Sequence, residues 1–251
     1  MLRSVPGLRE CRGLMFGGAD QPKREAAHAA VKRYVESGMV VGLGTGSTAT
    51  FAVRRIGELV ASGELRDIRG VPTSGKTTTL ANELGIPLST LSEARPRLTI
   101  DGADEISPEL FLIKGRGGAL LREKIVASSS QEGLIVVADS SKLVDPLGAG
   151  PLPVEIDSFG WESTLEALAS LGCEPELRMD RTYPERPFVT DGGHYTADCA
   201  FDRIADPASL EVEIKQIPGA LECGLFVGLA RAAVVAGESG IEFVEAGQHF
   251  S

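Results

Sequence analysis

Three carboxylates stand within five residues in the segment Asp101-Gly-Ala-Asp104-Glu105, which follows a short apolar run. Carboxylates at this spacing can bind sugar hydroxyl groups, hold a divalent cation or move protons. Taken alone, the segment could equally be a solvated acidic loop stabilised by an Asx turn. The surrounding segments therefore decide between these interpretations.

A cationic, glycine-rich segment, Lys114-Gly-Arg116-Gly-Gly, follows closely. Its backbone can wrap around a polyhydroxy or anionic ligand, and Lys114 or Arg116 can offset negative charge that develops during a reaction. Glu123 lies about one turn into the next predicted helix, where the alternative role is a surface residue paired with neighbouring arginine or lysine. Lys142, in ADSSKLV at 138–144, could bind an anion or a hydroxyl, or be a plain surface lysine.

The segment GLGTGST at 42–48 is typical of a turn between a buried strand and a helix. Glycine lets the backbone approach a ligand closely, and a helix N-terminus offers N–H groups to a phosphate. The segment is not a P-loop, because no Gly-Lys-Ser/Thr follows, and Ser47 stands at the third glycine position of a dinucleotide fingerprint. A phosphate site, with hydroxyls from Thr45, Ser47 and Thr48, and a purely structural turn both remain open.

The elements that must position these segments alternate along the first part of the chain. The sequence predicts helices over 20–36, 50–62, 77–84 and 120–128, and strands over 39–43, 68–71, 97–100 and 133–138. This alternation favours βαβ units around a parallel sheet with helices on both faces. Ligands bind beyond the carboxyl ends of the strands in such sheets, so the four segments are expected to form one site.

The pattern changes near Asp145, and the stretch 146–153, rich in proline and glycine, is expected to be a linker. The following residues predict helices over 161–171 and 207–216, strands over 174–179 and 220–227, and a hairpin over 188–201 that turns at Asp191-Gly-Gly. Residues 232–236 are expected to end a helix, and 241–244 to form a strand that returns to the first sheet. The predicted fold is α/β, with a flexible extension over 1–18, a Rossmann-like parallel-sheet domain over 19–149 plus 228–251, and a smaller inserted α+β domain over 150–227.

The composition narrows the class of partner. The chain has 251 residues and a net charge of −10, which disfavours nucleic acid and anionic membranes as partners. No apolar run reaches the about 20 residues needed to span a membrane. The four cysteines and three histidines are dispersed, with neither a CxxC nor an HExxH motif. We therefore expect a cytoplasmic protein without a metal site or a disulfide framework.

Together the segments resemble the A-type ribose-5-phosphate isomerases. The resemblance is carried by GLGTGSTA at 42–49, DGADEI at 101–106, KGRGGALLREKI at 114–125, ADSSKLVD at 138–145, PLPVEI at 151–156 and IPGALECGLF at 217–226. It implies the α/β fold described above and interconversion of D-ribose 5-phosphate and D-ribulose 5-phosphate through a cis-enediol(ate). It also implies the non-oxidative pentose phosphate pathway or the Calvin cycle as context, a homodimer or homotetramer, and no metal or organic cofactor.

The resemblance assigns a role to each matching residue. Glu123 corresponds to the base that moves a proton between C1 and C2, and Lys114 to the residue that stabilises the enediolate oxygen. Asp101 and Asp104 correspond to a loop that holds the sugar hydroxyls and assists ring opening. The implied substrate-binding residues are Thr45, Gly46, Ser47, Thr48, Asp101, Gly102, Ala103, Asp104, Lys114, Gly115, Arg116, Gly117 and Lys142. Lys23 or Arg24 could add charge at the phosphate, and Arg116 could instead face solvent.

Other classes of protein share parts of this pattern. A non-catalytic sugar-phosphate sensor of the same fold would need a DNA-reading module if it were a transcriptional regulator, and residues 1–18 are too short and irregular for a helix-turn-helix. A nicotinamide dehydrogenase is disfavoured by Ser47 and by the lack of a clear acid/base histidine for hydride transfer. The set of acid, base and lysine favours the isomerase.

Overall fold

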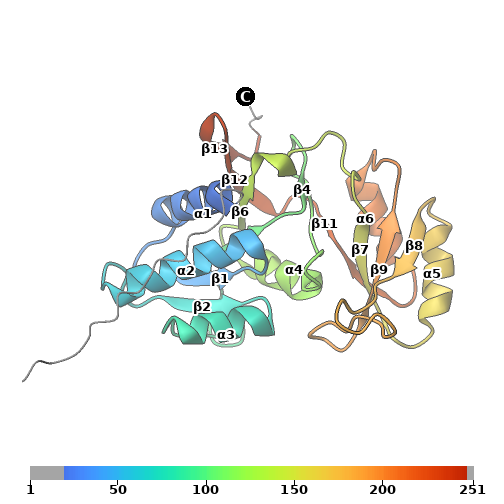
Figure 1. Cartoon of the computed structure of the whole chain (residues 1–251), viewed down its shortest axis with the longest axis horizontal. Helices are drawn as coiled ribbons and strands as arrows, with labels where there is room; N and C mark the ends of the chain where they lie inside the picture. Colours follow the sequence, from blue (N-terminus) through green and yellow to red (C-terminus); the bar gives the residue numbers. More distant parts are fainter. Residues whose placement is uncertain (1–19, 248–251) are drawn as a thin grey trace, which may run out of the picture.

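The computed structural model describes residues 20–247, so the predicted extension over 1–18 lies outside the described residues. A six-stranded sheet runs in the order β13-β12-β6-β3-β1-β2 (Figure 1). Its strands are β1 Val40–Leu43, β2 Arg69–Pro72, β3 Leu98–Gly102, β6 Leu134–Asp139, β12 Ala230–Gly237 and β13 Gly240–Glu245. Neighbouring strands are parallel except the β12–β13 pair, which is antiparallel. The α/β prediction is confirmed.

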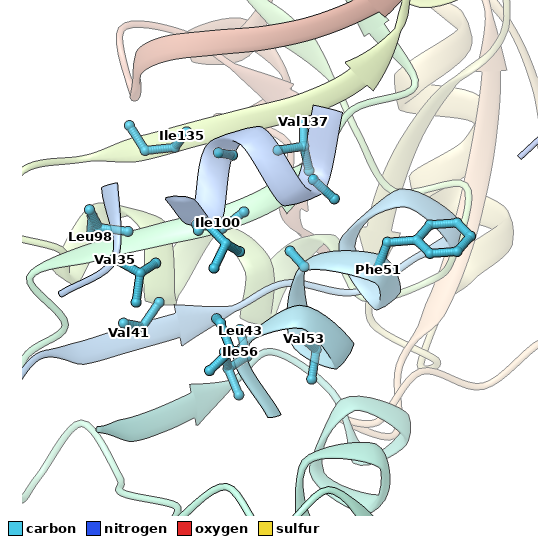
Figure 2. Close-up of a cluster of buried hydrophobic side chains, with 14 of the residues drawn as sticks. Val35, Val41, Leu43, Phe51, Val53, Ile56, Leu98, Ile100, Ile135 and Val137 are labelled. Carbon is cyan, nitrogen blue, oxygen red and sulfur yellow. The ribbon is translucent and has the colours of Figure 1, made fainter. Parts of the chain in front are cut away.

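Both faces of this sheet are buried, because alternate residues of one strand enter different hydrophobic clusters. In β6, Ile135 and Val137 pack with helices α1 (Gln21–Tyr34) and α2 (Ser47–Ala61), as Figure 2 shows for part of this cluster. Leu134 and Val136 face the opposite cluster, which includes Ala127 of helix α4 (Leu120–Ser129). Burial on both faces explains the nearly continuous apolar runs of the central strands.

A second, antiparallel sheet has the order β10-β7-β9-β8 and lies beside the first (Figure 1). Its strands are β7 Leu152–Ile156, β8 Glu174–Leu177, β9 Tyr195–Ala200 and β10 Ala220–Cys223, and it packs with helices α5 (Trp161–Ala169) and α6 (Pro207–Lys215). The short strands β4 (Glu105–Ile106), β5 (Leu112–Ile113) and β11 (Leu225–Phe226) form a third sheet. The boundaries of the two domains stay a prediction.

Several predicted elements are wrong in detail. Residues 232–236 belong to strand β12 and not to a helix. The alanine-rich run suggests a helix, but it pairs with β6 and β13 along its two edges, and its alternate side chains are buried in the clusters on the two faces of the sheet. The expected linker contains the start of β7, with Pro153 near the beginning of the strand, where proline is tolerated. The predicted strand over 220–227 divides at Gly224 into β10 and β11, which belong to different sheets.

The predicted hairpin forms only in part. Its turn is present, since Thr190 N–H donates to the carbonyl of His194 at 2.9 Å and Gly193 N–H donates to that of Thr190 at 2.9 Å. Only the second arm is a strand, namely β9. The first arm instead reaches toward the first sheet, where Asp191 contacts residues of α3 (Gly75–Glu83) and α4. The long-range contacts of Asp191 therefore replace strand pairing.

Candidate active site

Most of the predicted site residues converge on one pocket of about 100 Å³ beyond the carboxyl ends of β1 and β3. Its lining consists of Thr45, Gly46, Ser47, Thr48, Gly102, Ala103, Asp104, Lys114, Gly115, Gly117, Glu123 and Lys142. Two predicted binding residues are not in this lining. Asp101 is buried beneath the pocket, with 1% of its surface exposed, and the side chain of Arg116 is directed elsewhere.

Lys114 lies between two buried carboxylates. Its Nζ atom is 3.1 Å from Asp101 Oδ2 and 3.5 Å from Glu123 Oε2, and it donates to the carbonyl of Gly102 at 2.6 Å. The three side chains are 5% exposed or less. A cation enclosed by two carboxylates is suited to stabilise a negative oxygen that develops at the pocket wall.

The two carboxylates differ in their partners. Asp101 Oδ1 accepts the N–H groups of Thr45 at 3.0 Å and Gly102 at 2.7 Å. Burial raises the pKa of Asp101, whereas Lys114 and these two hydrogen bonds oppose the rise. Glu123 has no such donors within the described residues. Burial and the charge of Asp101 raise the pKa of Glu123 to about 8, while Lys114 opposes the rise. A carboxylate whose pKa lies near neutrality can both remove and return a proton.

The raised pKa of Glu123 predicts a pH-dependent stability. Its folded pKa of about 8 exceeds the ordinary value of 4.5, so the native state binds more protons between these values and stability falls as pH rises through about 8. Glu123→Gln should therefore match the wild-type melting temperature near pH 5 and exceed it by several degrees near pH 9, since about 1 kcal/mol corresponds to about 2–4 °C at this size. Thermal unfolding at both pH values tests this, and equal offsets would contradict it.

The acidic segment and the glycine-rich segment hold one another. Asp104 lines the pocket, and its Oδ2 accepts the N–H of Arg116 at 2.9 Å. The Arg116 guanidinium lies 3.5 Å from Glu105 Oε1, and 43% of its side chain is exposed. Arg116 therefore contributes its backbone to the site, whereas a contact of its side chain with substrate stays a prediction.

Glu105 has a structural role that the sequence did not reveal. Its carboxylate is buried and accepts the N–H groups of Gly148 at 2.8 Å, Ala149 at 3.2 Å and Gly150 at 2.6 Å. It thus fixes the chain just after the Lys142 segment. The only signal in the sequence was its place among three neighbouring carboxylates, which does not distinguish a residue that faces inward from one that faces the pocket.

The turn at 44–48 is built by Gly44, Gly46 and a group of hydroxyls. A Cβ at Gly44 would lie 2.2 Å from Asp101 Oδ1, so only glycine allows that approach, and Gly46 has a φ of +118° before α2 begins at Ser47. Ser47 and Thr48 therefore lie in the first turn of α2. The predicted helix began at residue 50, three residues later than the observed start.

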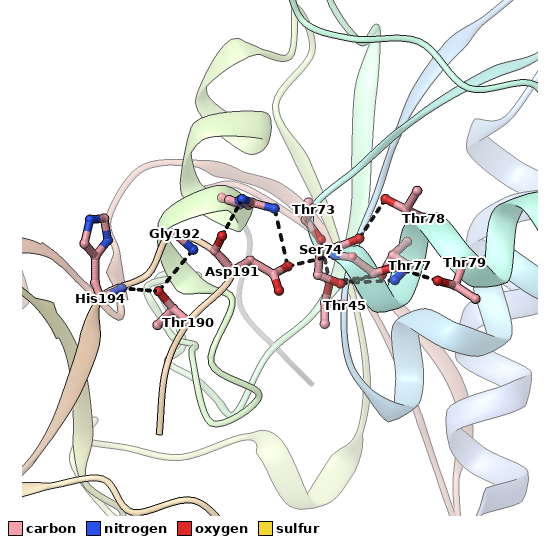
Figure 3. A network of polar contacts seen from close by, with 12 residues as sticks. Thr45, Thr73, Ser74, Thr77, Thr78, Thr79, Thr190, Asp191, Gly192 and His194 are labelled. Carbon is pink, nitrogen blue, oxygen red and sulfur yellow. Dashed lines mark hydrogen bonds and ion pairs between the residues drawn. The ribbon is translucent and has the colours of Figure 1, made fainter. Parts of the chain in front are cut away.

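The Thr45 hydroxyl is engaged by other hydroxyls of the protein, which argues against a role as a simple phosphate donor. Its Oγ1 lies 2.7 Å from Thr73 Oγ1, 2.8 Å from Ser74 Oγ and 3.0 Å from Thr77 Oγ1 (Figure 3). Thr73 and Ser74 lie in the turn between β2 and α3, and Thr77 lies in the first turn of α3. These three hydroxyls were missed, because nothing local relates them to residue 45. These hydroxyls hold the turn at 44–48 in place through Thr45.

The remaining cations differ in their relation to the pocket. Lys142, at the end of a short 3₁₀ helix (Ser140–Lys142), is half-buried and lines it. Lys23 pairs with Asp20 at 3.1 Å, and Arg24 lines a separate cavity beside His28. Neither Lys23 nor Arg24 lines the pocket, so their predicted role at the phosphate has no support in its geometry.

One other group has the residue types of a metal site. Among the described residues, Glu211, Glu222 and Cys223 bring three potential ligand atoms within 4.8 Å of one another. The Lys124 ammonium already lies 2.6 Å from Glu211 and 2.7 Å from Glu222. This group is therefore best described as a buried ion-pair cluster that joins α4 to α6 and β10.

Comparison with known proteins shows the family to which the chain belongs. Residues 69–240 match the family model described as ribose 5-phosphate isomerase A (phosphoriboisomerase A). A curated relative from Gloeobacter violaceus, named ribose-5-phosphate isomerase A, is 56% identical over 223 residues, which is 88% of this chain and 94% of the relative. The chain belongs to the ribose 5-phosphate isomerase A family. The predicted family and enzyme class are confirmed.

Solved structures of family members share the fold. The Methanocaldococcus jannaschii ribose 5-phosphate isomerase A is 38% identical, with a TM-score of 0.85 and coverage of 90% of this chain and 99% of that one. The Plasmodium falciparum ribose 5-phosphate isomerase is 41% identical, with a TM-score of 0.86 and coverage of 90% and 98%. Another member, 40% identical over 90% of this chain and 98% of its own, with a TM-score of 0.86, was solved in complex with phospho-erythronic acid.

Proposed function

We propose that this protein interconverts D-ribose 5-phosphate and D-ribulose 5-phosphate through a cis-enediol(ate), with Glu123 as the base. The observation that carries the proposal is the buried group of Glu123, Lys114 and Asp101 at the wall of the pocket. Proton abstraction next to a carbonyl needs a positioned base and a donor or cation where the oxyanion develops. Glu123 and Lys114 supply these two functions.

The proposed reaction moves one carbon-bound proton. The Glu123 carboxylate removes the C2 proton of the open-chain aldose, and the electron pair forms the C1–C2 double bond as charge develops on O1. Lys114 stabilises that charge. The hydroxyl proton passes from O2 to O1, and protonated Glu123 returns its proton to C1, which gives the ketone at C2. The pKa of about 8 allows Glu123 to act in both directions.

The other residues orient the substrate in this proposal. The N-terminus of α2, with Ser47 and Thr48, binds the phosphate, and Asp104 accepts sugar hydroxyls. Lys142, which also lines the pocket, adds a contact to the substrate. Asp101 has its oxygens engaged by Lys114 and two backbone N–H groups, so we assign it the positioning of Lys114 in place of direct contact with hydroxyls.

The context of the activity is also proposed. An enzyme with this reaction belongs in the non-oxidative branch of the pentose phosphate pathway or in the Calvin cycle. The described cysteines Cys173, Cys199 and Cys223 are free thiols, which supports a reducing, cytoplasmic compartment. No helix among residues 20–247 is long and apolar enough to cross a membrane. We retain a homodimer or homotetramer as the expected assembly.

Solvent deuterium exchange tests the function and separates it from the sensor alternative. With ribose 5-phosphate in D₂O and neither metal nor nicotinamide added, we expect NMR to show deuterium at C2 of ribose 5-phosphate and formation of ribulose 5-phosphate. A non-catalytic sensor would bind the sugar phosphate without exchange. That second outcome would refute the isomerase mechanism.

A further inference from the structure

Arg178 contacts the glycine-rich segment from outside the pocket. It follows β8, and only 14% of its side chain is exposed. Its Nη1 donates to the carbonyl of Gly115 at 2.9 Å and to that of Arg116 at 3.4 Å. Asp198 on β9 holds the same guanidinium through Nε at 2.8 Å and through Nη2. A residue just after a strand of the second sheet thus binds two carbonyls of the pocket wall.

These two bonds contribute to the direction in which the neighbouring N–H groups point. In a planar trans peptide, the N–H lies opposite the C=O. Because Arg178 holds the carbonyls of residues 115 and 116 on the outside, the N–H groups of Arg116 and Gly117 are directed to the other side. The Arg116 N–H indeed reaches Asp104 at 2.9 Å. Gly117 lines the pocket, and its N–H has no partner among residues 20–247.

Within the glycine-rich segment, the Gly118 N–H donates to the Gly115 carbonyl at 3.0 Å, but no N–H of the segment donates to the Arg116 carbonyl, which Arg178 holds from outside. Gly115 and Gly118 have φ values of +111° and +76°, and glycine populates many backbone conformations at similar energy. A Cβ at Gly118 would lie 2.4 Å from the Phe188 ring, so the loop also packs closely against the segment that connects β8 to β9. The outer contacts, with Arg178 first among them, therefore select one conformation of the loop.

We propose that Arg178 is a positioning residue for catalysis, which aims the Gly117 N–H at the bound substrate and holds Asp104 through the Arg116 N–H. The inference rests on the proposed isomerase function. Asp198 acts only through Arg178, by fixing the plane of its guanidinium. Lysine cannot replace this arrangement, because one ammonium does not reproduce the planar fork that binds a carboxylate and two carbonyls together.

The test compares Arg178→Met, Arg178→Lys and Asp198→Asn with the control Arg186→Met. Arg186 belongs to the same part of the chain, and 71% of its side chain is exposed, beside Glu185. Arg178→Met should lower kcat/KM by about 10–100-fold, since displacement of a positioning group by about 1 Å can cost about 100-fold. Arg178→Lys should lose about three- to tenfold, and Arg186→Met should retain the wild-type value.

Two further measurements distinguish positioning from general stability. Adding Asp198→Asn to Arg178→Met should cause no further loss of kcat/KM, because coupled residues are not additive. In a ¹⁵N-glycine-labelled sample, the Gly117 amide signal should shift on addition of phospho-erythronic acid to the wild type, and should not shift in Arg178→Met. Melting temperatures establish that each variant is folded at the assay temperature.

The outcomes separate this inference from the proposed function. Wild-type protein without isomerisation or deuterium exchange would refute the proposed function itself. If the wild type isomerises but folded Arg178→Met keeps its kcat/KM, the positioning role is wrong. If Arg178→Met does not fold, Arg178→Lys is the deciding variant. A wild-type kcat/KM in that variant, together with the same ligand-induced shift of the Gly117 signal as in the wild type, would overturn the inference.

Discussion

Replacing Glu123 by glutamine is expected to lower kcat by about 10²–10⁴-fold, the range that a positioned general base contributes, while KM changes little. Glutamine keeps the shape and burial of the side chain at the start of α4 but cannot accept the C2 proton. Because the neutral Glu123 predominates below its pKa of about 8, the amide also resembles the form that the free protein holds at neutral pH. Loss of activity therefore reports the missing base and not a damaged fold.

Steady-state kinetics and the C2 deuterium exchange assay measure this effect, and the wild-type pH profile gives an independent check. In the wild type, kcat/KM should rise with pH and level off above about 8, because the ionised form of Glu123 is the base. Glu123→Gln should lose this ionisation from its residual activity. The control is Arg122→Gln, which alters the adjacent, half-exposed side chain of the same helix. Near-normal turnover in Glu123→Gln would exclude Glu123 as the base.

The local sequence was sufficient to predict which segments meet at the site. Each of the four segments combines a strand end or helix start with polar side chains, and parallel strands bring such ends to one edge of the sheet. For the segments 42–48 and 101–104, this rule alone is enough to predict a place at the site. The α/β class followed from the same alternation of strands and helices. Family resemblance, and not periodicity, assigned Glu123 its role.

What the sequence could not predict depends on contacts between distant residues. The hydroxyls of Thr73, Ser74 and Thr77 gather around Thr45, and Arg178 reaches Gly115 across 63 residues of sequence. No local pattern encodes such partners. The error at 232–236 has the same origin, because alanine favours a helix in isolation, while the strands on either side of β12 impose an extended conformation.

The position of Lys114 explains why the site can hold two carboxylates below the surface. An isolated buried carboxylate is strongly disfavoured unless it is paired, and the Lys114 ammonium lies within 3.5 Å of both Asp101 and Glu123. It also lies 5.4 Å from the centroid of the buried Phe226 ring, a position that favours a cation. One side chain therefore serves both the stability of the pocket and the charge that develops during the reaction.

Lys114→Met, which keeps the length of the side chain and removes its charge, should therefore affect activity and stability together. We expect kcat/KM to fall by about 10²–10³-fold, the loss seen when one oxyanion donor is removed, and the free energy of unfolding to fall by about 3–5 kcal/mol, as for a buried ion pair that loses one partner. Because Lys114 lowers the pKa of both carboxylates, its removal should raise them and make the loss of stability with increasing pH steeper. Kinetics and urea unfolding at pH 6 and pH 9 measure both effects.

Lys142→Met is the matched comparison: this half-buried lysine lines the same pocket, so its loss should raise KM without moving the pH profile. Wild-type kcat/KM in folded Lys114→Met would refute its role at the oxyanion.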